Sequence, residues 1–139
     1  MKKVIVLSWV VVSVVLMSFY QSSLDKAVMQ RGKKVYDTYC LTCHQADGAG
    51  VPRMNPPLVK TTYVTGDKKR LINIILKGFN ESVELNGDYY DNPIPPQPQL
   101  NDQQIADVLT YVRNSFGNKA SVITVAEVKA ERAKLKKKP

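Results

Sequence analysis

The 139-residue chain has few of the side chains that build metal sites or disulfide scaffolds, since it contains only two cysteines and one histidine. Two cysteines are too few for a domain held together by disulfides, and one histidine leaves little scope for a metal site made of side chains alone. Hydrophobic residues make up 44% of the chain and charged residues 23%. These values exclude collagen-like and disordered chains, and the length fits one globular domain.

The body of the chain also lacks a strong excess of one charge, although the formal net charge is +8. Residues 24–120 hold 12 positive and 10 negative side chains, so most of the excess lies at the two ends. A nucleic-acid-binding domain concentrates positive charge on its folded face. The charge distribution therefore argues against a nucleic-acid partner.

Residues 1–23 have the pattern of a targeting segment. Lys2 and Lys3 precede an apolar run from Val4 to Tyr20 that only three serines interrupt. This run is at the short end of what spans a bilayer, about 17–25 residues, and it is slightly long for the apolar part of a signal peptide. No small-x-small cleavage motif follows it. The pattern predicts a signal peptide or, preferably, an uncleaved membrane anchor, with the rest of the chain exported to the periplasmic side.

Four stretches with helical periodicity follow, and they predict an all-α fold. They begin near residues 24, 67, 101 and 124. The third is the clearest, because Asn101 and Gln104 form a capping-box pattern before apolar residues at helical spacing that end ahead of Gly117. We expect residues 24–120 to form the main domain, and residues 121–139 to add a short helix that frays into a basic tail.

Strand signals are weak. Residues 59–64 and 83–85 have the composition of short extended segments, and the second runs into an Asn-Gly pair at 86–87 that favours a small hairpin. The remaining connections are long loops rich in proline, glycine and asparagine. Loops of this length in a domain of about a hundred residues usually serve a function or enclose something large.

The residues that carry chemistry form the sequence CLTCH at positions 40–44, which is the C-x-x-C-H signature of c-type haem attachment. Cysteines at i and i+3 lie one above the other on a helix, so the sulfurs of Cys40 and Cys43 can reach the two vinyl groups on one edge of a porphyrin. The next residue, His44, can then lie under the iron as its proximal ligand. The motif predicts one covalently attached haem.

Three other interpretations of these residues compete with haem attachment. A thioredoxin-type redox pair would follow a strand, whereas a helical pattern precedes Cys40. A zinc site needs four ligands, so a carboxylate would have to complete the set of two cysteines and one histidine. A structural disulfide between Cys40 and Cys43 would leave His44 without a role. Haem attachment accounts for all three residues, and we favour it.

With this motif, the chain resembles a class I cytochrome c domain of bacterial type over residues 27–118. The resemblance includes Gly32 and Tyr36 before the motif, the sequence NPPL at 55–58 and the helix sequence QQIADVLTYVRN at 103–114. It implies an all-α, cytochrome c-like fold that wraps around one covalent haem.

Two packing features are implied by the same resemblance. The first and last helices of such a domain cross closely, and Gly32 and Tyr111 would meet at that crossing. A backbone carbonyl near residues 56–57 would bind the ring N–H of His44 and fix the orientation of the ring.

The resemblance also implies a function. Members of the family shuttle electrons outside the cytoplasmic membrane, often as subunits or partners of dehydrogenases and oxidases. We therefore expect an electron carrier rather than an enzyme. Its redox partner would be a dehydrogenase or a terminal oxidase, and its N-terminal segment would hold it at the membrane.

The chain departs from the family on the distal side of the haem. Family members usually place a Met-Pro pair in a loop before the last helix, and the methionine sulfur is the sixth iron ligand. The matching position holds Ile94, which cannot coordinate iron. Met29 precedes the haem motif, and Met54 lies in the loop that the family keeps on the proximal side, so neither is expected to replace the missing ligand.

Loss of the thioether ligand has a physical consequence, because that ligand favours Fe(II). We predict a lower reduction potential and a five-coordinate or water-ligated iron in an apolar pocket lined by Ile94. The alternative function is a haem protein that binds CO, NO or O₂, or a weak peroxidase, although no second histidine is there for acid–base chemistry. A small shift of the loop that brings in another ligand would instead leave an ordinary electron carrier. The adjacent residues Tyr89 and Tyr90 either line the pocket or cover the core.

Overall fold

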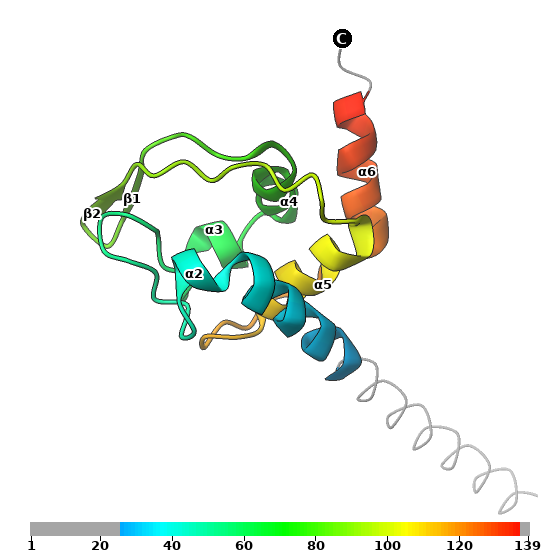
Figure 1. Ribbon diagram of the computed structural model, residues 1–139, viewed down its shortest axis with the longest axis horizontal. Helices are drawn as coiled ribbons and strands as arrows, with labels where there is room; N and C mark the ends of the chain where they lie inside the picture. Colours follow the sequence, from blue (N-terminus) through cyan, green and yellow to red (C-terminus); the bar gives the residue numbers. More distant parts are fainter. Residues whose placement is uncertain (1–25, 137–139) are drawn as a thin grey trace, which may run out of the picture.

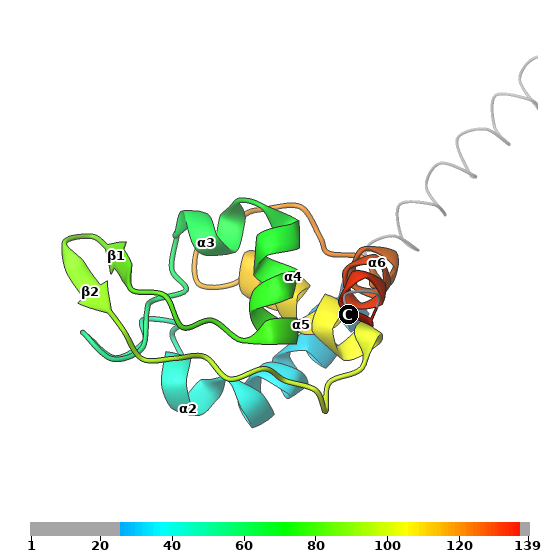
Figure 2. The ribbon, with the colours of Figure 1, turned by 90° about the horizontal axis from the view of Figure 1, so that it is seen from above.

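Residues 26–136 are the part of the chain that the computed structural model describes, and they form helices, long loops and one β-hairpin. Residues 26–39 are helical. The elements that follow are α2 (Leu41–His44), α3 (Thr62–Thr65), α4 (Lys68–Lys77), β1 (Val83–Leu85), β2 (Asp88–Tyr90), α5 (Asp102–Arg113) and α6 (Val125–Lys136). The hairpin and α6 lie at opposite ends of the molecule, with α4 and α5 between them (Figure 1 and Figure 2). The predicted helical fold is confirmed.

The whole of the predicted targeting segment, together with the last three residues of the basic tail, lies outside the described residues. Within residues 26–136, no helix is both long enough and apolar enough to cross a membrane. The N-terminal anchor therefore stays a prediction from the sequence.

Capping residues begin and end the two central helices where the sequence indicates. The side chain of Asp67 accepts a hydrogen bond from the backbone N–H of Arg70 at 2.9 Å and begins α4, while Gly78 ends it with a φ of 78°. Asn101 and Gln104 form a reciprocal capping box at the start of α5, with distances of 2.9 and 3.0 Å. Each cap satisfies backbone groups that the first turn of a helix leaves unpaired.

The predicted hairpin is present. β1 and β2 pair antiparallel, with Val83 opposite Tyr90 and Leu85 opposite Asp88. The linking pair, Asn86–Gly87, has positive φ values of 56° and 86°. A two-residue turn of this kind needs positive φ at both positions, which asparagine and glycine tolerate best.

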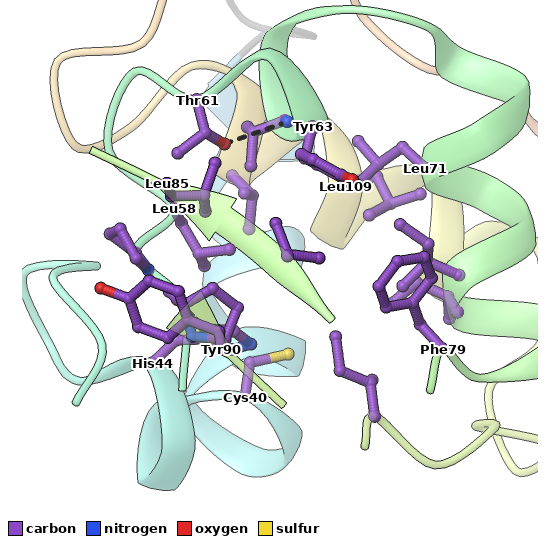
Figure 3. A pocket seen from close by; sticks show the side chains of 18 of the residues that line it. Cys40, His44, Leu58, Thr61, Tyr63, Leu71, Phe79, Leu85, Tyr90 and Leu109 are labelled. Carbon is purple, nitrogen blue, oxygen red and sulfur yellow. Dashed lines mark hydrogen bonds between the residues drawn. The ribbon is translucent and has the colours of Figure 1, made fainter. Parts of the chain in front are cut away.

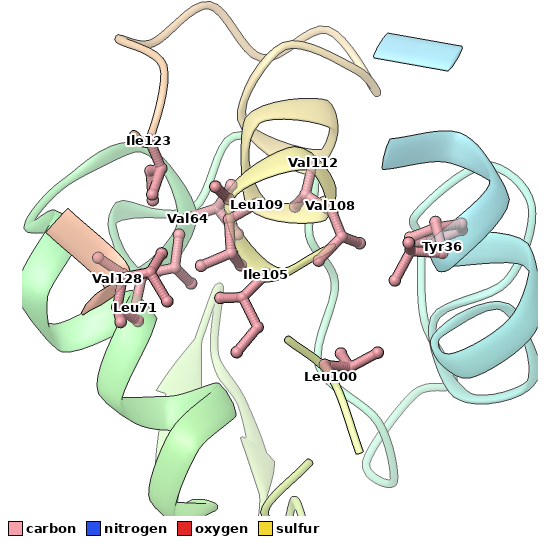
Figure 4. Packing of buried hydrophobic residues seen from close by; sticks show 13 residues of the cluster. Tyr36, Val64, Leu71, Leu100, Ile105, Val108, Leu109, Val112, Ile123 and Val128 are labelled. Atoms are coloured by element: carbon pink, nitrogen blue, oxygen red, sulfur yellow. The ribbon is translucent and has the colours of Figure 1, made fainter. Parts of the chain in front are cut away.

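One hydrophobic cluster fills the interior, and α5 supplies much of it. In Figure 4, Val64 of α3, Leu71 of α4 and Val128 of α6 lie on one side of the apolar side chains of α5, and Tyr36 lies on the other. Ile123 and Val128 belong to the same cluster, although both lie beyond residue 120. The last helix is therefore packed into the core of the domain, an association that its basic sequence does not indicate.

Polar contacts also fasten α6. Thr124 and Glu127 cap its start, since the Glu127 carboxylate accepts the Thr124 N–H at 2.7 Å and the Thr124 hydroxyl accepts the Glu127 N–H at 3.2 Å. Lys68 of α4 pairs with Glu127 at 3.0 Å, and Arg132 pairs with Asp102 of α5 at 2.6 Å. These pairs join α6 to both of its neighbouring helices.

The helix of residues 26–39 crosses α5 at Gly32, as the family resemblance implies. A β-carbon on residue 32 would lie only 2.6 Å from the β-carbon of Tyr111. One turn further on, the buried ring of Tyr36 packs against Tyr111 and Phe116, with centroid distances of 5.5 and 5.4 Å. The small residue therefore allows two helices to approach closely beside an aromatic cluster.

The prediction of an extended segment at residues 59–64 is wrong. Residues 62–65 form the single helical turn α3, and the hydroxyl of Thr61 begins it by accepting the backbone N–H of Val64 at 3.3 Å. β-branched residues favour a strand only where a neighbouring strand pairs with them. The N-cap formed by Thr61 favours a helical turn instead.

The third helix is also shorter than its apolar spacing suggests. α5 ends at Arg113, four residues before Gly117. Phe116 has a φ of 57°, which a right-handed helix does not allow, and its ring lies against Gly48. Phe116 therefore belongs to the aromatic cluster at the helix crossing. Its position in the apolar spacing makes the helix look one turn longer in the sequence than it is.

Candidate functional site

A large cavity with mostly apolar walls lies between the CLTCH segment, α4, α5 and the hairpin. It holds about 900 Å³, part of it open to solvent. Cys40 and His44 line one wall, and Leu71 and Phe79 line another (Figure 3). Ile94 lines the cavity as well. The residues that the sequence assigns to the proximal and distal sides of a haem therefore border one space.

The CLTCH residues form a tight turn after the helix of residues 26–39. The backbone N–H groups of Cys43 and His44 donate to the Cys40 carbonyl at 3.2 and 2.9 Å. Cys40 lines the cavity, and its sulfur points into it (Figure 3). Cys43 is exposed and is not among the cavity-lining residues. The structure thus brings Cys40 and His44 together at the cavity and leaves Cys43 at the surface.

A backbone carbonyl holds the ring of His44, as the family resemblance implies. The Nδ1 atom of His44 is 3.0 Å from the carbonyl oxygen of Pro56. Because a carbonyl oxygen can only accept a hydrogen bond, Nδ1 carries the proton and donates it. The other ring nitrogen, Nε2, keeps its lone pair for a metal ion.

Burial shifts the pKa values of both cavity-facing motif residues. It lowers the pKa of His44, although the hydrogen bond to Pro56 acts in the opposite direction, so the ring is neutral at pH 7. Burial, with a smaller effect from Cys43, raises the pKa of the Cys40 thiol to about 11. Neutral imidazole is the form that binds iron, so the electrostatic environment of His44 suits a ligand.

The backbone at Ile94 is fixed by an antiparallel bridge. Its N–H donates to the carbonyl of Phe79 at 2.7 Å, and its own carbonyl accepts the N–H of Phe79 at 2.8 Å. Gly78 makes this approach feasible, since a β-carbon there would lie 2.5 Å from the Ile94 carbonyl oxygen. Ile94 therefore faces the cavity from a rigid position.

Neither methionine in the described part of the chain lines the cavity. Met54 is 54% exposed, and Met29 lies on the helix of residues 26–39. The cavity does contain side chains with oxygen atoms, among them Tyr63, Glu81 and Tyr90. That Met54 does not take the place of the missing distal methionine stays a prediction.

Several residues that line the cavity were not predicted from the sequence. Thr61, Tyr63 and Phe79 line the cavity, and the rings of Tyr63 and Phe79 meet edge to face with centroids 6.0 Å apart. The only sequence signal for them is that two aromatic residues stand in connecting segments. Of the tyrosine pair that the sequence analysis did name, Tyr90 lines the cavity, while Tyr89 is exposed.

Comparison with known proteins agrees with this geometry. The family model for cytochrome c matches residues 29–116. This span includes the CLTCH turn, the whole cavity wall, α5 and all but the first three residues of the helix that crosses it.

Individual relatives agree as well. Cytochrome c-552 from Thermus thermophilus is 33% identical over 112 residues, which cover 74% of this chain and 85% of that protein. The cytochrome c subunit of the quinone alcohol dehydrogenase from Gluconacetobacter polyoxogenes is 36% identical over 102 residues, which cover 70% of this chain and 21% of the subunit. The fructose dehydrogenase cytochrome subunit from Gluconobacter japonicus is 32% identical over 115 residues, which cover 78% of this chain and 23% of that subunit. The chain therefore belongs to the cytochrome c family, as an electron-transfer protein with one covalently bound haem c.

Proposed function

We propose that the haem is attached through Cys40 and Cys43, that His44 is its proximal iron ligand, and that the protein carries electrons between redox partners without catalysing a reaction of its own. Haem c supplies a one-electron Fe(III)/Fe(II) couple. The observation that carries the proposal is the hydrogen bond from Nδ1 of His44 to the Pro56 carbonyl. It leaves Nε2 available at the wall of an apolar cavity that Cys40 also lines.

The walls of the cavity fit a large, flat and mainly apolar group. Leu58, Val64, Leu71 and Leu109 come from four separate segments and give the space between them an apolar lining. Among the described residues, every buried side-chain nitrogen or oxygen atom has a hydrogen-bond partner. The parts of the walls that are already buried therefore contain no unsatisfied polar side-chain atom.

The exposure of Cys43 suggests where electrons would enter and leave. A thioether bond at this residue would bring one edge of the porphyrin close to the protein surface. Electron transfer at such an edge needs no bond to the partner. The protein would contribute the reduction potential and a docking surface.

A second candidate function, binding of CO, NO or O₂, is favoured by Ile94. The residue at the family's methionine position is aliphatic and faces the cavity, and no methionine of the described chain lines that cavity. An iron with an open sixth position would bind such molecules directly. A peroxidase activity has less support, because the chain holds no second histidine to act as a distal acid–base group.

We further propose a place on the periplasmic side of the membrane, with residues 1–23 as the anchor. The support is the pair Lys2 and Lys3 followed by a long apolar run. A dehydrogenase is the proposed partner, with a terminal oxidase as the alternative, because several relatives are named as cytochrome subunits of dehydrogenases.

Absorption spectroscopy tests the main proposal. The full chain would be produced together with the haem-attachment machinery, and oxidised and reduced spectra would be recorded with and without carbon monoxide. A pyridine haemochrome assay would report whether the vinyl groups are saturated, as in haem c. We expect a c-type spectrum that changes promptly when carbon monoxide is added.

A c-type spectrum that changes promptly with carbon monoxide would support the attachment and an open distal site, and it would keep gas binding as a candidate. A c-type spectrum that carbon monoxide leaves unchanged would support an electron carrier with a sixth ligand from another side chain, and it would contradict the open distal site. A spectrum without c-type haem would overturn the proposed attachment.

A further inference from the structure

Asn118, which lies after the end of α5, makes three hydrogen bonds through its buried side chain. Its Nδ2 atom donates to the carbonyl of Leu58 at 2.9 Å and to the carbonyl of Val112 at 2.8 Å. Its Oδ1 atom accepts the backbone N–H of Lys60 at 2.7 Å. Both amide protons and the oxygen are used, and the residue is 4% exposed. Asn118 therefore ties the segment 58–60 to the last turn of α5.

The segment 58–60 continues directly from the carbonyl that binds His44. Pro56 and Pro57 have no N–H groups, so they cannot fix their own position through backbone donors. The next N–H along the chain belongs to Leu58, and it donates to the carbonyl of Gly48 at 2.7 Å. The Leu58 carbonyl is held by Asn118. The Pro56 carbonyl thus depends on the anchors on its two sides, which are the backbone bridge between Asn55 and Val51 and the contacts of Leu58. Asn118 supplies one of the contacts of Leu58.

The backbone of Lys60 has a conformation that non-glycine residues disfavour, and the hydrogen bond to Asn118 helps to hold it there. Its φ is 52°, in the left-handed region, which is unfavourable for a residue with a β-carbon. A backbone in this region persists only where the surroundings determine it. The hydrogen bond from the Lys60 N–H to Asn118 is the shortest of the three that the asparagine side chain makes.

We propose that Asn118 is a positioning residue for the proximal iron ligand, because it holds the loop that presents the Pro56 carbonyl to the N–H of His44. The inference rests on the proposed role of His44. A hydrogen bond from Nδ1 to a carbonyl makes the imidazole a stronger electron donor at Nε2. Stronger donation favours Fe(III), so loosening this loop weakens the donation and raises the reduction potential.

The test compares Asn118→Ala with Thr110→Val in the haem-loaded full chain. Thr110 is also buried, and its hydroxyl accepts the Ile123 N–H at 2.9 Å and donates to the Ile123 carbonyl at 3.2 Å. It makes no side-chain hydrogen bond to residues 44–60, so it controls for the general loss of a buried polar contact. The measurements are the reduction potential, the iron–histidine stretching frequency in the resonance Raman spectrum of the ferrous protein, and the Tm.

We expect both variants to have a lower Tm, but only Asn118→Ala to change the other two readouts. Its reduction potential should rise and its iron–histidine frequency should fall, with a several-fold change in the one-electron equilibrium constant; a tenfold change corresponds to about 59 mV. Asn118→Ser retains one hydroxyl for one of the two loop groups and should give a smaller shift in the same direction. It carries the test alone if the alanine variant does not load haem.

Two failures are distinguishable. A wild-type chain without a c-type spectrum would overturn the proposed attachment. If the wild type loads haem, and the Asn118 variants lose stability while their potential and iron–histidine frequency equal those of the wild type, the positioning role is wrong and Asn118 is only structural.

Discussion

The backbone of Gly32 touches the backbone of Asp107, so that a β-carbon on residue 32 would lie 2.2 Å from the Asp107 carbonyl oxygen. The neighbouring Arg31 binds the Asp107 carboxylate with its Nε at 2.7 Å and a second nitrogen at 3.1 Å. The helix that leads into the haem motif is thereby held against α5. We therefore expect a change at this crossing to move the CLTCH turn relative to the α5 wall of the cavity.

The first prediction concerns this contact. Gly32→Ala should destabilise the protein, because a backbone carbonyl cannot move aside as a flexible side chain would. Overpacking of this kind costs about 1–3 kcal/mol, whereas alanine gains about 1 kcal/mol over glycine in helix propensity. Thermal unfolding of the haem-loaded protein measures the net loss, with Lys34→Ala, an exposed change on the same helix, as the control. Equal Tm values for Gly32→Ala and the wild type would show that the helices do not cross this closely.

Arg113 supports the second prediction. Its guanidinium is almost fully buried, and it donates to the carbonyls of Val64 at 2.6 Å, Gly66 at 3.1 Å and Ser121 at 2.8 Å. Arg113→Met keeps most of the apolar volume but leaves these carbonyls without partners, so we expect a loss of about 3 kcal/mol of unfolding free energy. Arg53→Met, at a highly exposed position, should change it by less than about 0.5 kcal/mol. Chemical denaturation measures the unfolding free energy of both variants. Equal losses would show that the buried hydrogen bonds of Arg113 do not stabilise the fold.

A structural feature of this protein can be predicted from the sequence when the residues that form it lie close together in the chain. The haem motif, the caps of α4 and α5, and the Asn86–Gly87 turn are all encoded within a few neighbouring residues. The caps and the turn have their expected structure, because their partners lie within the same short segment. The bond between His44 and Pro56 spans twelve positions, and only the resemblance to a family indicated it.

The unpredicted features depend on partners far along the chain. Asn118 and Arg113 are polar residues near the end of a helix, and nothing beside them shows that they bind carbonyls about fifty or sixty positions away. Phe116 continues an apolar helical pattern, yet its place is over Gly48. Such contacts arise from the packing of whole segments, which periodicity does not encode.

The third prediction is a pH dependence that arises in α6. The pKa of Glu131 is lowered, mainly by hydrogen bonds from Lys134 and Asn73, and the pKa of Glu127 is lowered, mainly by the backbone N–H of Thr124. A carboxylate whose pKa is depressed by folding stabilises the folded state above its ordinary pKa, near 4.5, and loses this effect as the pH falls through the folded-state value. The Tm should therefore decrease as the pH is lowered from 5 toward 3.

A variant isolates this effect. Glu131→Gln removes one of the two titrating groups, so its Tm should depend less steeply on pH over the same range. Glu84→Gln removes an exposed carboxylate from the hairpin and should keep the wild-type slope. Identical slopes for all three proteins would mean that the contacts of α6 do not contribute to acid unfolding.

The fourth prediction concerns attachment. Cys40→Ala and Cys43→Ala should each leave one thioether bond, and the double variant should leave none. Haem should therefore stay with the chain in a denaturing gel for the wild type, for both single variants and for the control Thr42→Ala, which changes the same turn. The double variant should release it. Haem that still migrates with the denatured double variant would contradict attachment at these two residues.

The last prediction tests the distal side through Ile94→Met. The backbone at residue 94 is held by two hydrogen bonds to Phe79, so a new side chain enters the cavity without moving the chain. Methionine has nearly the volume of isoleucine, and its unbranched thioether reaches further and bends readily. If residue 94 faces the iron, the sulfur should bind it, raise the reduction potential and slow the binding of carbon monoxide.

Ile94→Leu is the matched control, because leucine is equally apolar and carries no ligand atom. It should leave the potential and the carbon monoxide kinetics close to those of the wild type. The methionine variant should also show the sulfur-to-iron charge-transfer band in its oxidised spectrum. If the methionine and leucine variants behave alike, the distal position lies elsewhere on the cavity wall. The oxygen-bearing side chains Tyr63, Glu81 and Tyr90 would then be the next residues to replace.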